Sequence, residues 1–131
     1  MINILVVDDE RDQVTFLVET LKTCPNYQVA GTDCPLKALS FCEENKVDII
    51  ITDVNMPEMT GIEMIPKLKK INPLCQIVVM TGNSNLYNVM KCLELGVTDY
   101  FRKPFKVGEI LESIEAIIHK VERWKETINT D

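Results

Sequence analysis

Short unbroken runs of apolar residues recur along the chain, and most are followed by a stretch with helical spacing. Apolar runs without polar alternation are typical of strands that are buried on both faces. The clearest run is Ile49-Ile50-Ile51, which ends abruptly at Asp53. Five strands are predicted in this way, over residues 2–7, 28–30, 48–52, 76–80 and 99–102.

Between these runs, apolar residues recur three and four positions apart, which indicates amphipathic helices. Val14, Leu17, Val18 and Leu21 predict a helix over residues 11–23. A second helix is predicted from Pro35 to Asn45, with Leu36, Leu39 and Cys42 facing inward. Further helices are indicated by Leu86, Val89, Met90 and Leu93, with Gly96 as C-cap, and by the stripe Ile110, Leu111, Ile114, Ile117, Ile118, Val121 and Trp124.

The third helix carries two conflicting signals. Thr60-Gly61-Ile62-Glu63 matches a capping box, which marks a helix start. Pro66 removes a helical hydrogen bond if it lies in the interior. We therefore expect the regular helix to begin near Met64, after a looser turn. Strand and helix still alternate five times with short links, which predicts a doubly wound α/β fold, a five-stranded parallel sheet with helices on both faces.

The length, charge and composition of the chain disfavour several classes of protein function. A chain of 131 residues is most simply one domain. Its apolar runs are far shorter than the roughly 20 residues of a membrane span, and its start does not read as a signal peptide. We therefore expect no membrane partner and a cytoplasmic location. The net charge of −6 disfavours direct nucleic-acid binding. The five cysteines lack a CxxC pair, which favours reduced structural thiols.

Four of the five predicted strands end in a residue with useful chemistry. These residues are Asp8 and Asp9 after the first strand, Asp53 after the third, Thr81 after the fourth and Lys103 after the fifth. Asp53 alone could be a helix N-cap or turn residue, and Thr81 a turn hydroxyl. In parallel sheets, however, ligands bind outside the carboxyl ends of the strands, where these residues would meet.

Three carboxylates in one cleft repel each other unless positive charge compensates them. Lys103 supplies one charge, and a divalent cation with oxygen ligands could supply two more. Magnesium fits this donor set, whereas the absence of histidine and cysteine from these segments disfavours zinc. An aspartate beside magnesium and lysine suits phosphoryl transfer. No general base is evident to activate water, which favours a phosphoryl group that persists.

These residues resemble the receiver domain of two-component response regulators, over about residues 2 to 120. The resemblance implies a flavodoxin-like strand order 2-1-3-4-5, a receiver domain over residues 1–120 and a C-terminal extension of the last helix over residues 121–131. The matching segments are Val7-Asp8-Asp9-Glu10, Asp53 with Met56-Pro57 and Gly61, Val79-Met80-Thr81-Gly82, and Lys103-Pro104-Phe105.

The resemblance also assigns roles to the strand-end residues. Asp53 would accept a phosphoryl group from a phosphohistidine on a sensor histidine kinase or histidine phosphotransfer protein. Lys103 would contact that group. Magnesium would be held by Asp8 or Asp9, by Asp53 and by the backbone carbonyl of Asn55, with Asp9 favoured as the direct ligand and Asp8 acting through water. Self-catalysed phosphorylation and dephosphorylation of the aspartate are implied, and no enzymatic activity beyond them.

Signal output is implied to pass through two switch residues. Thr81 would shift towards the phosphoryl group and Tyr100 would turn inward, changing the face formed by the fourth helix, fifth strand and fifth helix, where a downstream effector would bind. Without the resemblance, Tyr100 reads as a half-buried strand aromatic. Asn55 and Asn83 lie where side chains in this family tune the lifetime of the acyl phosphate.

The end of the last helix leaves three alternatives open. Its stripe continues through Val121 and Trp124, beyond what the sheet can cover. It could form a homodimer seam, lead into an output domain, or be a solvated helix end. His119, the only histidine, lies off this stripe and is predicted to be a surface residue.

Two functions other than that of a receiver share part of this residue pattern. A haloacid-dehalogenase-type phosphatase uses similar residues but needs an acid two positions after its nucleophile, where this chain has Asn55. A pseudo-receiver would keep the fold as a protein-interaction module only. Loss of Asp9, Asp53 or Lys103 would indicate it, and all three are present.

Overall fold

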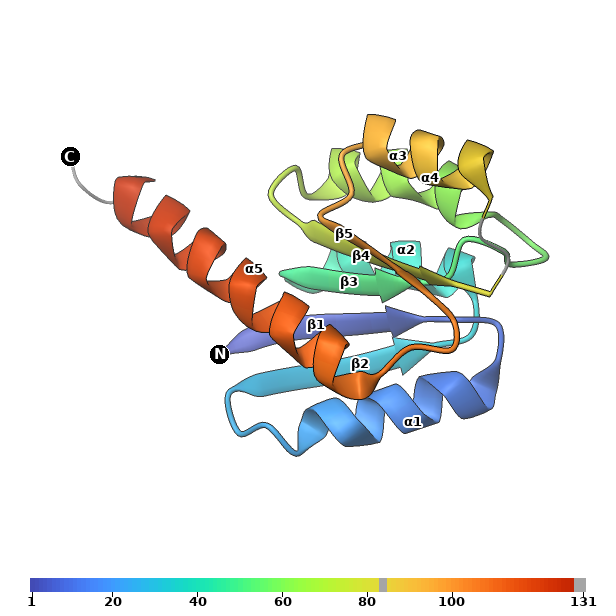
Figure 1. The fold of residues 1–131 in the computed structure, drawn as a ribbon. Coiled ribbons are helices and arrows are strands. Elements are labelled where there is room, and N and C mark those ends of the chain that lie inside the picture. Colours follow the sequence, from blue (N-terminus) through green and yellow to red (C-terminus); the bar gives the residue numbers. More distant parts are fainter. Residues whose placement is uncertain (83–84, 129–131) are drawn as a thin grey trace.

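Parallel strands form a central sheet in the order β2-β1-β3-β4-β5 (Figure 1). The computed structural model describes residues 1–82 and 85–128, and in this part of the chain the sheet has five strands. The predicted doubly wound architecture and the flavodoxin-like order are both confirmed. The strands are β1 (Ile2–Val7), β2 (Tyr27–Thr32), β3 (Ile49–Thr52), β4 (Gln76–Thr81) and β5 (Asp99–Arg102).

Helices cover both faces of this sheet. Helices α1 and α5 pack on one face, and α2, α3 and α4 pack on the other (Figure 1). None of the described helices is both long enough and apolar enough to cross a membrane. The helices are α1 (Arg11–Lys22), α2 (Pro35–Glu44), α3 (Gly61–Ile71), α4 (Leu86–Glu94) and α5 (Val107–Ile128).

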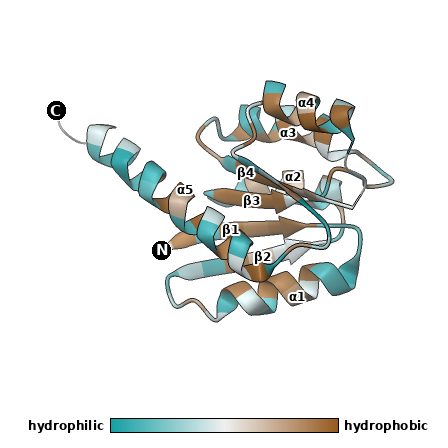
Figure 2. Cartoon of the chain, in the orientation of Figure 1, coloured by the Kyte–Doolittle hydropathy of each residue, from teal (hydrophilic) through white to brown (hydrophobic). Residues whose placement is uncertain are grey.

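Strand β3 contributes hydrophobic side chains to the cores on both faces of the sheet. Ile49 and Ile51 lie in the core beneath α1 and α5, whereas Ile50 lies in the core beneath α2, α3 and α4. Successive side chains of a strand point to opposite faces, so an unbroken isoleucine run fills both cores at once. Figure 2 shows the same hydrophobic character along β1 and β3.

The register of the strands brings their carboxyl ends to one edge. Val7 of β1 pairs with Thr52 of β3, which in turn pairs with Val79 of β4. The ladder continues one residue further, because the Asp53 amide donates to the Val7 carbonyl at 3.0 Å and the Lys103 amide to the Thr81 carbonyl at 2.8 Å. Backbone hydrogen bonds therefore hold both Asp53 and Lys103 at the sheet edge.

Helix α3 begins earlier than the sequence predicted. The expected start near Met64 is wrong, because the helix begins at Gly61 with a complete capping box. The Glu63 amide donates to the Thr60 hydroxyl at 3.1 Å, and the Thr60 amide to the Glu63 carboxylate at 3.5 Å. Pro66 lies inside the helix. The cap and the buried face of Met64, Ile65 and Leu68 outweigh its missing hydrogen bond.

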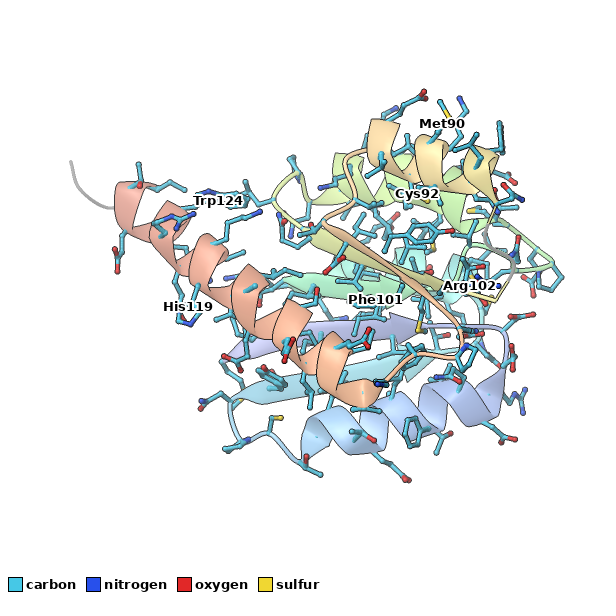
Figure 3. The ribbon with its side chains drawn as sticks, viewed as in Figure 1. Met90, Cys92, Phe101, Arg102, His119 and Trp124 are labelled. Atoms are coloured by element: carbon cyan, nitrogen blue, oxygen red, sulfur yellow. The ribbon has the colours of Figure 1, made fainter. Side chains whose placement is uncertain are left out.

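The predicted inward face of α2 is confirmed in part, because Leu39 and Cys42 pack against the core, whereas α4 buries a different face from the one that its pattern indicated. Leu36 of α2, predicted to face inward, is 52% exposed, and Ala38 is buried instead. Met90 of α4 points away from the sheet and Cys92 towards it (Figure 3). The exposed face of α4 is apolar and carries Leu86, Tyr87, Met90 and Leu93. The two residues of α4 that are buried are Asn88 and Cys92.

Helix α5 continues without a break past residue 120 to Ile128. Val121 packs against the core as a half-buried residue, while Trp124 and Ile128 are exposed. His119 of α5 is exposed, as predicted (Figure 3). The boundary at residue 120 and the role of the extension stay predictions, and residues 129–131 of the extension lie outside the described part.

A buried tyrosine ties β2 to α5 and makes stability depend on pH. The Tyr27 hydroxyl donates to Glu115 at 2.8 Å, and only 8% of Tyr27 is exposed. Burial, followed by the hydrogen bond and charge of Glu115, raises the pKa of Tyr27. The phenol of the unfolded chain ionises near pH 10, so the contribution of Tyr27 to stability is present below that pH and is lost as pH rises above it.

Replacing Tyr27 by phenylalanine tests this linkage. We expect Tyr27→Phe to lower the free energy of unfolding by about 1 kcal/mol at pH 7 and to flatten its decrease above pH 10. Urea unfolding between pH 7 and 11 measures both effects. Tyr87→Phe, at an exposed position of α4, is the matched control and should follow the wild type. Parallel pH curves for Tyr27→Phe and the wild type would contradict the assignment.

Candidate functional site

A lysine joins two aspartates at the carboxyl edge of the sheet. The Lys103 ammonium lies 2.7 Å from Asp8 and 3.0 Å from Asp53. The three residues follow β5, β1 and β3, so the predicted convergence of strand ends is present in the fold. Asp8 and Asp53 are buried, and the Lys103 side chain is 15% exposed.

Burial and ion pairing act in opposite directions on the pKa values of Asp8 and Lys103. Burial raises the pKa of Asp8, and the hydrogen bond from Lys103 only partly offsets it. Burial also opposes the charge of Lys103, but its hydrogen bonds to Asp8 and Asp53 outweigh this and raise the pKa of the ammonium group. Lys103 is therefore a stable cation, whereas the negative charge on Asp8 depends on its partner.

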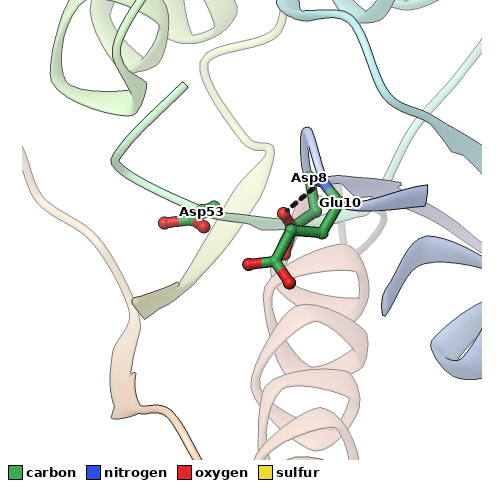
Figure 4. Close-up of side chains that lie close together, drawn as sticks. All are labelled: Asp8, Glu10 and Asp53. Atoms are coloured by element: carbon green, nitrogen blue, oxygen red, sulfur yellow. Dashed lines mark hydrogen bonds between the residues drawn. The ribbon is translucent and has the colours of Figure 1, made fainter. Parts of the chain in front are cut away.

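Glu10 joins the acidic group, which the sequence did not predict. Oxygens of Asp8, Glu10 and Asp53 all lie within 4.8 Å of one another (Figure 4). The Glu10 amide donates to Asp8 at 3.0 Å, so the turn after β1 brings its side chain back towards the site. Asp9 is exposed, and its role as metal ligand stays a prediction. The acidic run Asp8-Asp9-Glu10 was the available signal.

Asn55 connects the aspartate to the threonine. Its backbone amide donates to Asp53 at 3.1 Å, and its side-chain amide donates to the Thr81 hydroxyl at 3.1 Å. Thr81 is fully buried at the end of β4. The sequence predicted a place for both residues in the site but not their contact. Asn83 lies outside the described residues.

Gly61 allows the loop after Asp53 to fold back closely. A Cβ atom at position 61 would lie 2.6 Å from the Asp53 carbonyl oxygen and 2.9 Å from the Val54 Cα atom. The Gly61 amide donates to the Val54 carbonyl at 2.7 Å. The start of α3 is thereby locked against the segment that carries Asp53.

Tyr100 lies away from this cluster. It is half-buried in β5 and packs against the core beneath α2, α3 and α4. The sequence indicated this half-buried strand environment for Tyr100, and the role of Tyr100 in a switch stays a prediction.

An open hollow of about 350 Å³ lies beside Lys103 and is lined by Gln13, Phe16, Lys103, Pro104 and Phe105.

Comparison with known proteins identifies the family. A family model described as the response regulator receiver domain matches residues 4–115. The chain belongs to this family. It is thus a receiver domain of two-component response regulators, as its strand-end residues indicated.

Relatives of this receiver domain include longer regulators. The DNA-binding transcriptional regulator NtrC of Azospirillum brasilense is 34% identical over 116 residues, which cover 88% of this chain and 24% of that protein. The alkaline phosphatase synthesis transcriptional regulatory protein PhoP of Bacillus subtilis is 34% identical over 119 residues, covering 91% and 49% respectively. The chain thus spans about a quarter of the length of the first relative and about half of the length of the second.

A solved structure shares the same fold. The solution structure of the beryllofluoride-activated NtrC4 receiver domain dimer has a TM-score of 0.85 and 27% sequence identity, and the match covers 92% of this chain and 98% of that one.

The donor set of the receiver site fits a hard divalent cation. Two buried carboxylates and the exposed carboxylate of Glu10 face one ammonium group, so acidic groups outnumber the basic one at this site. Oxygen ligands of this kind suit magnesium. The pocket thus combines a buried carboxylate, a fixed cation and further carboxylate oxygens, which are groups suited to phosphoryl transfer.

Proposed function

We propose that this receiver domain accepts a phosphoryl group on Asp53. The observation that carries the proposal is the contact of Asp53 with Lys103 at 3.0 Å, beside the buried Asp8. Lys103 lies where it can neutralise charge on the transferred group, and the backbone ladder fixes Asp53 at the sheet edge. Phosphoryl transfer depends chiefly on such positioning and charge stabilisation.

Magnesium is the proposed cofactor. Asp8, Asp9, Asp53 and the backbone carbonyl of Asn55 are its proposed ligands, and the position of Glu10 supports it as a further carboxylate of the pocket. A bound magnesium ion would neutralise charge on the phosphoryl oxygens. The chain itself supplies the nucleophile, and Lys103 supplies the second cation.

The proposed phosphoryl donor is a phosphohistidine on a sensor histidine kinase or a histidine phosphotransfer protein. A carboxylate oxygen of Asp53 would form the new bond to phosphorus as the phosphorus–nitrogen bond breaks, and the histidine nitrogen would leave with the electron pair. The match to response regulators supports this class of partner. The hollow beside Lys103 supports access to the site from that side.

Thr81 and Tyr100 are the proposed switch residues, and the face formed by α4, β5 and α5 is the proposed effector surface. The exposed apolar residues of α4 support this choice, because exposed apolar patches often mark protein-binding surfaces. Leu86 is 74% exposed and Leu93 is 63% exposed. The dimer of the NtrC4 receiver domain supports a homodimer as one possible assembly. The cytoplasmic location stays a prediction from the sequence.

The proposal includes self-catalysed phosphorylation and dephosphorylation but no further enzymatic activity. A phosphatase of the haloacid-dehalogenase type needs an acid at position 55. Asn55 is an amide that donates to Thr81, which supports a receiver over that enzyme. A pseudo-receiver would lack magnesium-dependent phosphorylation altogether.

Intact-mass spectrometry after incubation with acetyl phosphate and magnesium tests the proposal. We expect a labile adduct of one phosphoryl group in the wild type, no adduct without magnesium, and none in Asp53→Asn. Asp33→Asn is the matched control, since Asp33 lies at the same sheet edge but pairs with Arg11, and it should be labelled normally. An adduct in Asp53→Asn would contradict the assignment. Failure with both acetyl phosphate and a phosphohistidine donor, together with no magnesium binding, would establish a pseudo-receiver.

A further inference from the structure

One residue contacts both the proposed nucleophile and the proposed switch. The backbone amide of Asn55 donates to Asp53, and its side chain donates to the Thr81 hydroxyl, each at 3.1 Å. Positions 55 and 81 are 26 residues apart; Asn55 lies in the loop after β3, and Thr81 is the last residue of β4. The contact therefore depends on the fold and is not a local turn.

The environments of the two side chains differ. Thr81 is fully buried, whereas Asn55 is exposed. The Asn55 amide is thus a donor from the solvent side that holds a buried hydroxyl oxygen in place. In this contact the Thr81 hydroxyl oxygen is the acceptor. What the contact restricts is the position of the oxygen.

We propose that the Asn55 side chain is a positioning residue that holds Thr81 in its unphosphorylated arrangement. In the proposed function, Thr81 shifts towards a phosphoryl group on Asp53. That shift would take the hydroxyl out of the position in which it accepts from the Asn55 amide, and this hydrogen bond would break. Asn55 therefore opposes the switch, and the inference rests on the proposed function of Asp53 and Thr81.

The expected effect is modest but measurable. A typical intramolecular hydrogen bond contributes enough to change an equilibrium by about twofold to tenfold. Water can reach the exposed Asn55 position and partly replace the lost donor, which places the expected effect of Asn55→Ala at about threefold. The direction of the change in affinity is informative. Removal of the Asn55 side chain is expected to tighten the binding of a phosphoryl mimic, because Asn55 opposes the switch.

Beryllofluoride with magnesium is the probe, since binding affinity avoids any effect of Asn55 on hydrolysis. We compare Asn55→Ala with the wild type, and the same substitution in a Thr81→Val background. Alanine keeps the backbone amide that donates to Asp53 and the backbone carbonyl proposed to face the metal. We expect about threefold tighter binding when Thr81 is present, and less than a twofold change when its hydroxyl is absent.

Asn45→Ala is the matched control, because Asn45 is an exposed asparagine that caps α2. It should bind the probe like the wild type. Thr81→Ala serves as the hydroxyl-free background if the valine variant does not fold. Weaker binding by Asn55→Ala, or an equal change in both backgrounds, would overturn the inference while leaving the proposed function intact. Absence of Asp53-dependent binding in the wild type would overturn both.

Discussion

Replacing Lys103 by methionine is expected to lower the free energy of unfolding by about 3 kcal/mol at pH 7 in the absence of divalent cations. Methionine has a similar length but no charge. The buried carboxylates of Asp8 and Asp53 would lose the cation that lies 2.7 and 3.0 Å from them. Removing one partner of a buried ion pair leaves an uncompensated charge, which is the costly part of such a change.

The loss should become smaller at low pH. Burial already raises the pKa of Asp8, and without Lys103 that pKa rises further. A carboxyl group that is protonated in the folded state carries no charge to compensate. We therefore expect the difference between Lys103→Met and the wild type to be smaller at pH 4 than at pH 7, as measured by urea unfolding.

Two further variants separate this effect from a general loss of lysine. Lys106→Met removes an exposed charge three residues away and should change stability by no more than about 0.5 kcal/mol. Asp8→Asn in the Lys103→Met background should recover part of the loss, because it removes the orphaned carboxylate. Equal losses in Lys103→Met and Lys106→Met would show that the ion pairs at the site do not stabilise the fold.

Replacing Gly61 by alanine is expected to destabilise the protein by about 2–4 kcal/mol. The new Cβ atom would meet the Asp53 carbonyl oxygen at 2.6 Å and the Val54 Cα atom at 2.9 Å, and both are backbone atoms that cannot rotate away. The start of α3 would have to move from the loop that carries Asp53. We therefore expect weaker magnesium binding as well as lower stability.

Gly108→Ala is the matched control for this substitution. Gly108 lies in the first turn of α5, and a Cβ atom there would meet nothing within 4 Å. Alanine is the better helix former, so this variant should be as stable as the wild type or more stable by up to about 1 kcal/mol. Thermal unfolding and a magnesium titration of both variants make the comparison. A Gly61→Ala variant with unchanged stability would contradict the close approach.

Much of the site could be predicted because strand ends follow from the chain itself. Asp8, Asp53 and Lys103 each come directly after a strand, and parallel strands bring such positions to one edge. Glu10 was missed because its place depends on the turn after β1, which folds its side chain back towards Asp8. No periodic pattern describes that turn.

Residue spacing and capping motifs predicted which segments are helices and strands, but they did not decide where helix α3 begins. The capping box of Thr60 and Glu63 and the interior Pro66 favoured different helix starts. Burial of Met64, Ile65 and Leu68 against the sheet favours the longer helix. That burial is a tertiary contribution, and it exceeds the cost of one missing helical hydrogen bond.

The sequence by itself determined the strands, the helices, the parallel sheet and the set of residues at its reactive edge, because hydrophobic period and strand ends are local properties. Only the tertiary structure decided which stripe of a helix faces the core, as in α4, where Cys92 is buried and Met90 is exposed. It also decided that Asn55 contacts Thr81. Helical spacing shows that a stripe exists, whereas the side that becomes buried depends on how neighbouring elements pack.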